Sequence, residues 1–260
     1  MKRVCFDEIA AHKGHGNYRL VISAPELGIV LDVLQDRKKE TLEAWFLERG
    51  KEWCAGVESY CADMWDAYHG AAQKHLPNAT PVVDRFHVMK NLNDALSKTR
   101  RKAQKKLDEA ALKAMKGIRW LLVRNRDDLT DEQRQQLDAM LAQTPELTTC
   151  YELKESFRAL LNSALTLEVA LSKLDEWMQQ ARDTGFSAMK TFADTLNNWR
   201  VAIANYFVDR MNNGFAEGVN NKIKLILRRA FGYHTIMSLR LHILVAFEPK
   251  PLDAVMYNSR

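Results

Sequence analysis

Three acidic residues are placed where their carboxylates could act together on a phosphate ester. Asp7 lies inside an apolar run typical of a β-strand, where an unpartnered charge is costly to bury. Asp63 closes a second such run, and Glu217 lies near the start of a helical stretch. Clustered carboxylates repel one another unless a cation lies among them, and Mg²⁺ and Mn²⁺ prefer oxygen ligands. The set therefore predicts two-metal phosphoryl transfer on a nucleic acid strand.

Each of these acids also has an ordinary structural explanation. Asp7 could end its strand and face water, and Asp63 could cap the helix that follows it. Glu217 would be favoured by the helix dipole whatever its function. Only the convergence of the three side chains distinguishes a catalytic set from three separate structural residues.

The elements that must position these acids follow from the apolar spacing. Three strands are predicted at residues 3–9, 18–23 and 29–34, a fourth at 57–62 and a fifth from residue 81, with helices at 39–54 and 64–76. Parallel neighbouring strands would place Asp7 and Asp63 side by side at one end of the sheet. This order predicts an α/β fold of the RNase H-like type, with three antiparallel strands followed by parallel ones.

From residue 88 the pattern is helical, and two last helices are predicted at about 213–230 and 236–246. The expected organisation is a first part of the core at 1–90, a helical insertion at 91–205, the catalytic helix and a final helix at 206–248, and a loose tail at 249–260. We expect Trp120, Trp177 and Trp199 to anchor the core of the insertion.

The net charge of +5 is mild, but it is distributed unevenly. Residues 85–126 carry +10 and residues 127–197 carry −7. A solvated helix face explains such runs as readily as nucleic acid binding does. The densest basic cluster consists of Lys98, Arg100, Arg101 and Lys102, and contacts from such residues to phosphates would be independent of sequence and sensitive to salt.

Several classes of protein are disfavoured. The four cysteines form no CxxC pair, which argues against a zinc or redox motif and favours buried thiols. No stretch approaches the roughly 20 apolar residues of a membrane span, and the first residues lack the apolar core of a signal peptide. No phosphate-cradling glycine loop or nucleophile elbow supports a small-molecule enzyme. We expect a cytoplasmic protein.

A specific motif follows the fifth strand. The run Asp84-Arg85-Phe86-His87-Val88 resembles the DRFHV signature of the ISL3 family of bacterial insertion-sequence transposases. The segments around Phe6-Asp7-Glu8 and from Ala216 to Lys224 are similar to the same family. The resemblance spans nearly the whole chain and is weakest between about 127 and 195.

The resemblance implies a DDE transposase catalytic domain that cleaves transposon ends and joins them to target DNA with two Mg²⁺ or Mn²⁺ ions. By motif, the first acid is Asp7 and the last is Glu217. The middle acid is Asp63 or Asp84, of which we favour Asp63. His87 would assist the site or serve a structural role, and Glu8 should point to the opposite face of its strand.

Residues near Glu217 indicate the expected partner. Asn221, Lys224 and Arg228 share the helix face of Glu217 and would meet DNA phosphates, while Val219 and Ile223 turn to the core. We expect DNA as the partner and a homo-oligomer, with neither a membrane nor a small-molecule substrate.

The resemblance also predicts a departure from the family. Its members carry an N-terminal zinc-binding and helix-turn-helix region, and we expect this chain to lack it. The alternative function is an inactive DNA-binding or oligomerisation fragment that modulates a full-length transposase.

Overall fold

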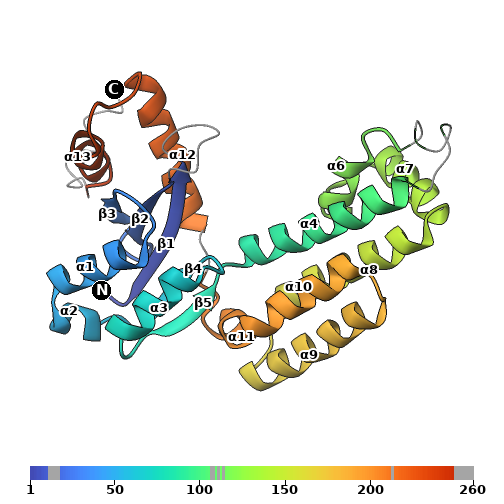
Figure 1. Cartoon of the computed structure of the whole chain (residues 1–260), viewed down its shortest axis with the longest axis horizontal. Helices are drawn as coiled ribbons and strands as arrows, with labels where there is room; N and C mark the ends of the chain where they lie inside the picture. The colour runs from blue at the N-terminus through green and yellow to red at the C-terminus, as the bar shows by residue number, and fades with distance from the viewer. Residues whose placement is uncertain (11–17, 106–108, 110–111, 113–114, 212–213, 249–260) are drawn as a thin grey trace, which may run out of the picture. The chain divides into compact units, whose positions relative to one another are not determined.

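The computed structural model describes residues 1–10, 18–105, 109, 112, 115–211 and 214–248. The chain divides into two compact units, which are described separately (Figure 1). The sheet unit comprises Met1–Asp84 with Met211–Arg260, and the helical unit comprises Arg85–Arg210. The predicted tail at 249–260 and part of the helical stretch predicted between 88 and 126 lie outside the described residues.

The sheet unit contains five strands in the order β3-β2-β1-β4-β5. Their bounds are β1 Arg3–Ala10, β2 Tyr18–Ala24, β3 Ile29–Leu34, β4 Ser59–Ala62 and β5 Thr80–Val83. The pairs β1–β2 and β2–β3 are antiparallel, whereas β4 runs parallel to both β1 and β5. The predicted mixed sheet of an RNase H-like α/β fold is confirmed, with β1 at its centre.

Five helices accompany the sheet: α1 Lys39–Arg49, α2 Lys51–Ala55, α3 Asp66–His75, α12 Gly214–Arg229 and α13 Ile236–Ala246. The single helix predicted at 39–54 is wrong, because Gly50 separates α1 from α2. Its φ of 85° lies in the left-handed region that glycine tolerates and other residues avoid.

The alternation of β1 divides the sheet unit into two cores. Phe6 belongs to the core on the side of α1 and α3, where Trp45 and Tyr68 are also buried. Ile9 belongs to the core on the other side, where α12 and α13 contribute Val219 and other apolar residues. Because successive side chains of a strand point to opposite faces, Asp7 shares the α12 side with Ile9.

A buried ion-pair network attaches α13 to the edge strand. Asp32 of β3 is 1% exposed and accepts hydrogen bonds from the Arg240 guanidinium and, at 2.8 Å, from the Trp45 indole. Burial alone would raise the pKa of Asp32, but the hydrogen bonds from Arg240, from the Val33 backbone and from Trp45 outweigh it and lower the pKa below its usual value. The carboxylate is fully surrounded by donors, which identifies it as a structural residue.

The helical unit is built from helices α4 to α11, which Figure 1 shows as a separate body. Their bounds are α4 Arg85–Gln104, α6 Ile118–Val123, the 3₁₀ turn η1 Arg126–Asp128, α7 Asp131–Ala142, α8 Pro145–Asn162, α9 Leu167–Asp183, α10 Ser187–Asn198 and α11 Arg200–Asp209. No helix in the described ranges is long and apolar enough to cross a membrane.

Aromatic packing fills the core of the helical unit. Trp177 is 4% exposed, packs against Phe157 and Phe192, and donates its indole N–H to a backbone carbonyl of α8. Trp120 is 64% exposed, so its predicted role as a core anchor is wrong. Its ring instead lies beneath the Arg119 guanidinium in a cation–π contact, 5.3 Å from the ring centroid.

Candidate active site

The strand register brings three aspartates to one edge of the sheet. Cys5 of β1 pairs with Cys61 of β4, and Cys61 pairs with Val82 of β5. Two residues beyond these partners come Asp7, Asp63 and Asp84. Because the three strands are parallel and adjacent strands lie about 4.8 Å apart, their carboxyl ends place all three acids at the same level of the sheet.

Asp7 is fixed by a residue from α12. The Asn220 side-chain amide donates to Asp7 Oδ2 at 2.9 Å and has a longer contact of 3.4 Å with the Glu8 carbonyl. Asp7 Oδ1 accepts the backbone N–H of Glu8 at 2.7 Å. These bonds join β1 directly to the helix that carries Glu217.

Asp84 and Asp7 both raise the pKa of the Cys61 thiol, which is buried in β4. Asp84 is 3% exposed, and its backbone N–H donates to the Ala62 carbonyl at 3.1 Å, which extends the pairing beyond β5. A hydrogen bond with Cys5 and burial, together with the negative charges of Asp84 and Asp7, raise the pKa of the Cys61 thiol. Both carboxylates therefore lie near the sulfur of the central parallel strand.

A buried histidine holds the backbone of Asp63. His69 is 4% exposed, and its Nε2 lies 3.1 Å from the Asp63 carbonyl oxygen, while its Nδ1 lies 3.1 Å from the Tyr60 hydroxyl. Burial lowers the pKa of His69, so the ring is neutral near pH 7. Since a carbonyl only accepts, Nε2 carries the proton and Nδ1 accepts from Tyr60. The Asp63 carboxylate itself accepts the Met64 N–H at 2.6 Å.

Glu217 occupies the exposed face of α12, one turn before Asn220. Asn221, Lys224 and Arg228 are also exposed. Val219 and Ile223 are 1% and 0% exposed and pack toward the sheet, as predicted from the helical spacing. The helix thus presents one acid and several polar or basic side chains away from its apolar face.

Glu8 lies on the opposite face of β1, as predicted. Its carboxylate accepts hydrogen bonds from Arg37, at 3.0 and 3.2 Å, and from the Tyr68 hydroxyl at 2.7 Å. The Arg37 guanidinium also packs over the rings of Tyr18 and Trp65, at 4.5 and 4.6 Å from their centroids. Glu8 is therefore satisfied by a separate network on the α3 side of the sheet.

The remaining predicted site residues belong to the helical unit. His87 is half-buried in α4, and its ring packs edge-on against Phe86 at 5.5 Å. Arg85 of the same motif donates to the Tyr206 hydroxyl and to the Asn162 side chain, so it links α4 to α11 and α8. Residues 85–87 of the motif therefore make contacts within the helical unit, whereas Asp84 belongs to the sheet unit.

The basic cluster on α4 does not form one uniform surface. Lys98, Arg101 and Lys102 are exposed, whereas Arg100 is half-buried and bonds to Gln104. Burial and the nearby charges of Arg119 and Arg101 lower the pKa of Arg100. Its side chain thus has different surroundings from the other three.

A family model for the ISL3 group of DDE transposases, described as Transposase, matches residues 4–243. The chain belongs to this family. It is 33% identical over 247 residues to the transposase for insertion sequence element IS1001 of Bordetella parapertussis, covering 94% of this chain and 60% of that protein. It is 27% identical over 262 residues to the transposase for IS1557 of Mycobacterium tuberculosis, covering 92% of this chain and 58% of that protein.

The chain therefore spans about three fifths of the length of these ISL3 relatives. No solved structure matches it significantly. The fold and the site geometry of this family member are therefore inferred from its own structure, without a solved relative.

The donors at the sheet edge of this ISL3 chain suit a hard divalent cation. Carboxylate oxygens predominate, and Asn220 Oδ1, next to Asp7, is buried without a hydrogen-bond partner among the residues that the structure describes. Among the described residues, no three His, Cys, Asp or Glu side chains are grouped closely enough to hold a metal ion. The chemistry of the donors fits such an ion, and the side chains would have to draw closer to enclose it.

Sequence reasoning missed Asn220 and His69. Asn220 had a detectable signal, because it lies three residues after Glu217 and two adjacent asparagines are unfavourable in a helix interior. Nothing in the residues around His69 distinguished it from a surface histidine at the start of a helix.

Proposed function

We propose that this chain carries the catalytic domain of a DDE-type transposase, which cleaves DNA strands at transposon ends and transfers them to target DNA. Asp7, Asp63 and Glu217 are the proposed metal-binding acids, with Asp84 as the alternative middle acid. When bound, two Mg²⁺ or Mn²⁺ ions would supply an activated oxygen nucleophile and stabilise the leaving oxygen.

The hydrogen bond between Asn220 and Asp7 is the observation that best supports this proposal. It ties α12, which carries the last proposed acid, to the strand that carries the first, although the two residues are 213 positions apart in the chain. The amide orients the Asp7 carboxylate from the helix that carries Glu217.

The surrounding residues have complementary tasks in this proposal. His69 holds the backbone at the end of β4 through the Asp63 carbonyl, and Asn220 holds the Asp7 carboxylate. Lys224 and Arg228 on the exposed face of α12 would bind phosphates beside the acids, and Asn221 would donate hydrogen bonds there.

The proposed partner is DNA, and the proposed assembly is a homo-oligomer. Lys98, Arg101 and Lys102 of the helical unit would add salt-sensitive contacts to the DNA backbone. The protein would act on bacterial DNA at the nucleoid in the cytoplasm.

The test is a Mn²⁺-dependent cleavage and strand-transfer assay on a plasmid that carries the terminal repeats of the element. The wild-type chain should nick and join DNA, and Asp7→Asn should reduce the rate by about 10³-fold or more, because it removes charge needed to stabilise the transition state. Asp131→Asn, at a surface aspartate of the helical unit with a side-chain exposure of 89%, is the matched control and should retain full activity.

The same assay distinguishes Asp63 from Asp84 as the middle acid. A large loss in Asp63→Asn with residual activity in Asp84→Asn supports our assignment, and the reverse result transfers the role to Asp84. DNA binding without cleavage in the wild-type chain, with no response to Mn²⁺, would contradict the catalytic proposal and favour the alternative of a modulating fragment.

A further inference from the structure

A basic groove lies within the helical unit, between the end of α4 and the start of α10. It has a volume of about 410 Å³. Seven residues line this groove: Lys98, Arg101, Lys102, Lys105, Ser187, Ala188 and Thr191. Four of them are cationic and two carry hydroxyl groups.

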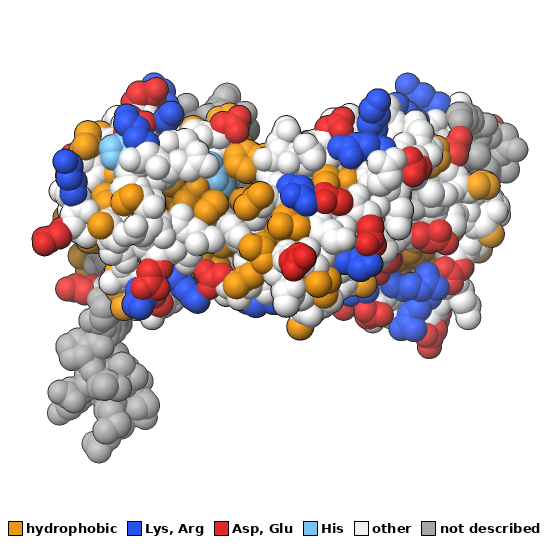
Figure 2. Space-filling view, turned by 90° about the horizontal axis from the view of Figure 1, so that it is seen from below, with side chains coloured by type: hydrophobic (Ala, Val, Ile, Leu, Met, Phe, Trp, Pro, Cys, Tyr) orange, Lys and Arg blue, Asp and Glu red, His pale blue; other side chains and the backbone are white. Residues whose placement is uncertain are grey.

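The four cations share one face of the chain as it leaves α4. Lys98, Arg101, Lys102 and Lys105 are spaced at i, i+3, i+4 and i+7, so neighbouring like charges lie close together. Such pairs cost helix stability, and no carboxylate in the part of the chain that the structure describes forms an ion pair with them. Figure 2 shows both signs of charge intermixed over the face that it draws.

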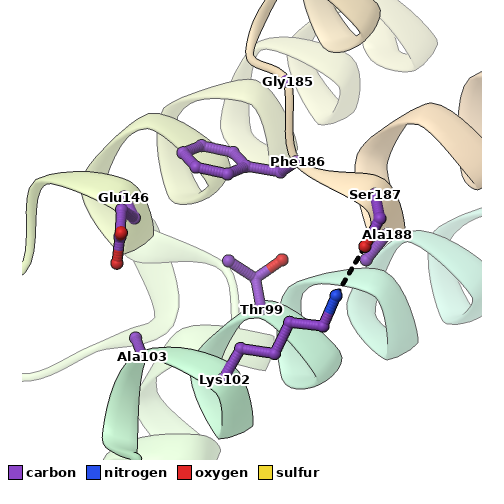
Figure 3. A pocket seen from close by; sticks show the side chains of 8 residues that line it. All are labelled: Thr99, Lys102, Ala103, Glu146, Gly185, Phe186, Ser187 and Ala188. Atoms are coloured by element: carbon purple, nitrogen blue, oxygen red, sulfur yellow. Dashed lines mark hydrogen bonds between the residues drawn. The ribbon is translucent and has the colours of Figure 1, made fainter. Parts of the chain in front are cut away.

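The opposite wall of the groove adds hydrogen-bond donors. Lys102 Nζ donates to Ser187 Oγ at 2.6 Å, as Figure 3 shows, which fixes the ammonium group and leaves the serine hydroxyl hydrogen free to point outward. Ser187 is the first residue of α10, and no side chain caps the start of that helix. The hydroxyl and the first backbone N–H groups of α10 therefore border the same space as the cations.

We propose that this groove binds the sugar-phosphate backbone of DNA, an inference that rests on the proposed function and extends the contacts of Lys98, Arg101 and Lys102 to a built site shared with Lys105 and the start of α10. The stripe from Lys98 to Lys105 extends about 10 Å, which is long enough to contact more than one phosphate of a DNA strand. Among the described residues of the lining, Ala188 alone is apolar, whereas a groove for a protein segment needs apolar anchors.

One acidic residue lies nearby but outside the groove. Glu146 lines an adjoining hollow of about 270 Å³, which shares Lys102, Ser187 and Ala188 with the groove (Figure 3). The carboxylate would repel a phosphate entering that hollow. DNA is therefore directed along the side of the groove formed by Lys98, Arg101 and Lys105.

The test measures binding of the full chain to a random-sequence DNA duplex by fluorescence anisotropy at several salt concentrations. Changing Lys98, Arg101, Lys102 or Lys105 singly to Gln should weaken binding several-fold and reduce the slope of log K against log salt by about 1 each. Ser187→Asp should weaken binding at least as much, because it places a carboxylate in the groove. Lys173→Gln, on α9 outside the groove, is the matched control and should leave the slope unchanged.

Equal losses in Lys173→Gln and the groove variants would overturn the proposal, as would unchanged binding in Ser187→Asp. Stronger binding of a polyglutamate peptide than of DNA would identify the groove as a protein interface and also overturn it. Asp7→Asn should bind DNA as the wild type does. Loss of DNA binding therefore tests the groove, and loss of cleavage tests the catalytic site.

An independent observation concerns Asn220. Its side chain is 7% exposed, and its amide nitrogen bonds to Asp7, while its Oδ1 is buried without a partner. A buried polar atom without a partner costs stability, so a group that bonds to Asn220 Oδ1 would stabilise the folded chain. We infer that Asn220 is a positioning residue, which holds Asp7 for a divalent cation and faces the same ion or its water with Oδ1. This inference also rests on the proposed metal site.

The test is a titration of the full chain with Mn²⁺, followed by thermal unfolding. Asn220→Ala should raise the Mn²⁺ concentration for half-maximal stabilisation by about 10–100-fold, as expected when a hydrogen bond to a metal ligand is lost. Asn220→Leu keeps the volume and removes both polar atoms, and should give the same shift. Asn125→Ala is the matched control, because it removes a 2.7 Å hydrogen bond to Asp128 at the surface of the helical unit.

An unchanged midpoint in both Asn220 variants would overturn this role while leaving the metal site intact. An equal shift in Asn125→Ala would also overturn it. Absence of any Mn²⁺ response in the wild-type chain would contradict the metal site itself, and the role of Asn220 with it.

Discussion

Two aspartates of the sheet unit each bind one of the C-terminal helices, through different kinds of donor. Asp32 is bound to α13 through the Arg240 guanidinium and receives a further bond from Trp45. Asp7 is bound to α12 through the neutral amide of Asn220. The comparison shows that a guanidinium and an indole hold Asp32 within the fold, whereas an amide from the helix that carries Glu217 orients Asp7.

The largest expected effect is the loss of unfolding free energy when Asp32 is replaced. Asp32→Ala leaves the Arg240 and Trp45 donors without their acceptor and should lower the free energy of unfolding by about 3–5 kcal/mol. Urea unfolding followed by tryptophan fluorescence measures the change. A loss below about 1 kcal/mol would show that Asp32 is not a structural anchor.

Addition of Mn²⁺ should separate the two aspartates by function. At a concentration 100 times its dissociation constant, the ion should stabilise the wild type and Asp32→Asn by about 2.7 kcal/mol each, because it binds only the folded chain. Asp7→Asn should show little of this gain. Equal stabilisation of all three proteins would contradict the distinction between Asp7 and Asp32.

The indole donor to Asp32 should contribute a smaller amount. Trp45→Phe keeps an aromatic ring but removes a hydrogen bond to a buried carboxylate, and should cost about 2 kcal/mol of unfolding free energy. Trp53→Phe, at the neighbouring ring 5.3 Å away, is the control and should cost less. Equal costs for the two variants would assign the effect to ring packing instead.

The loss of stability at low pH should give the smallest difference between the wild type and a variant. Because the pKa of Asp32 is lower in the folded chain than in the unfolded one, its contribution to stability is complete above about pH 4 and is lost as pH falls through the folded pKa. Asp32→Asn should therefore lose less additional stability than the wild type between about pH 5 and pH 2. Parallel stability curves for the two proteins would contradict the lowered pKa.

Local pattern predicted the sheet and the edge at which its acids lie. The strands rich in β-branched residues appear close to their predicted positions, and their parallel order places Asp7, Asp63 and Asp84 at one level. The resemblance to the ISL3 family agrees with the match of the family model over residues 4–243. These features depend on periodicity and motif, both of which can be read within short windows.

The partners of these acids could not be predicted in the same way. Asp32 pairs with Arg240 across 208 positions, and Asp7 pairs with Asn220 across 213. Such contacts depend on how α12 and α13 pack on the sheet, and no local spacing encodes that packing. The break at Gly50 was missed for a related reason, because apolar spacing continues through α1 and α2 while the backbone changes direction between them.

The sheet unit is discontinuous in sequence, since the 126 residues from Arg85 to Arg210 separate its strands from α12 and α13. At 5–20 residues per second, a ribosome needs about 6–25 s to synthesise that stretch. During this interval the nascent sheet has no helix over Val21 and Val33, and Asp7 lacks its amide partner. A newly made chain is consequently exposed to aggregation on that side, and it completes its candidate active site only after the helical unit has been synthesised.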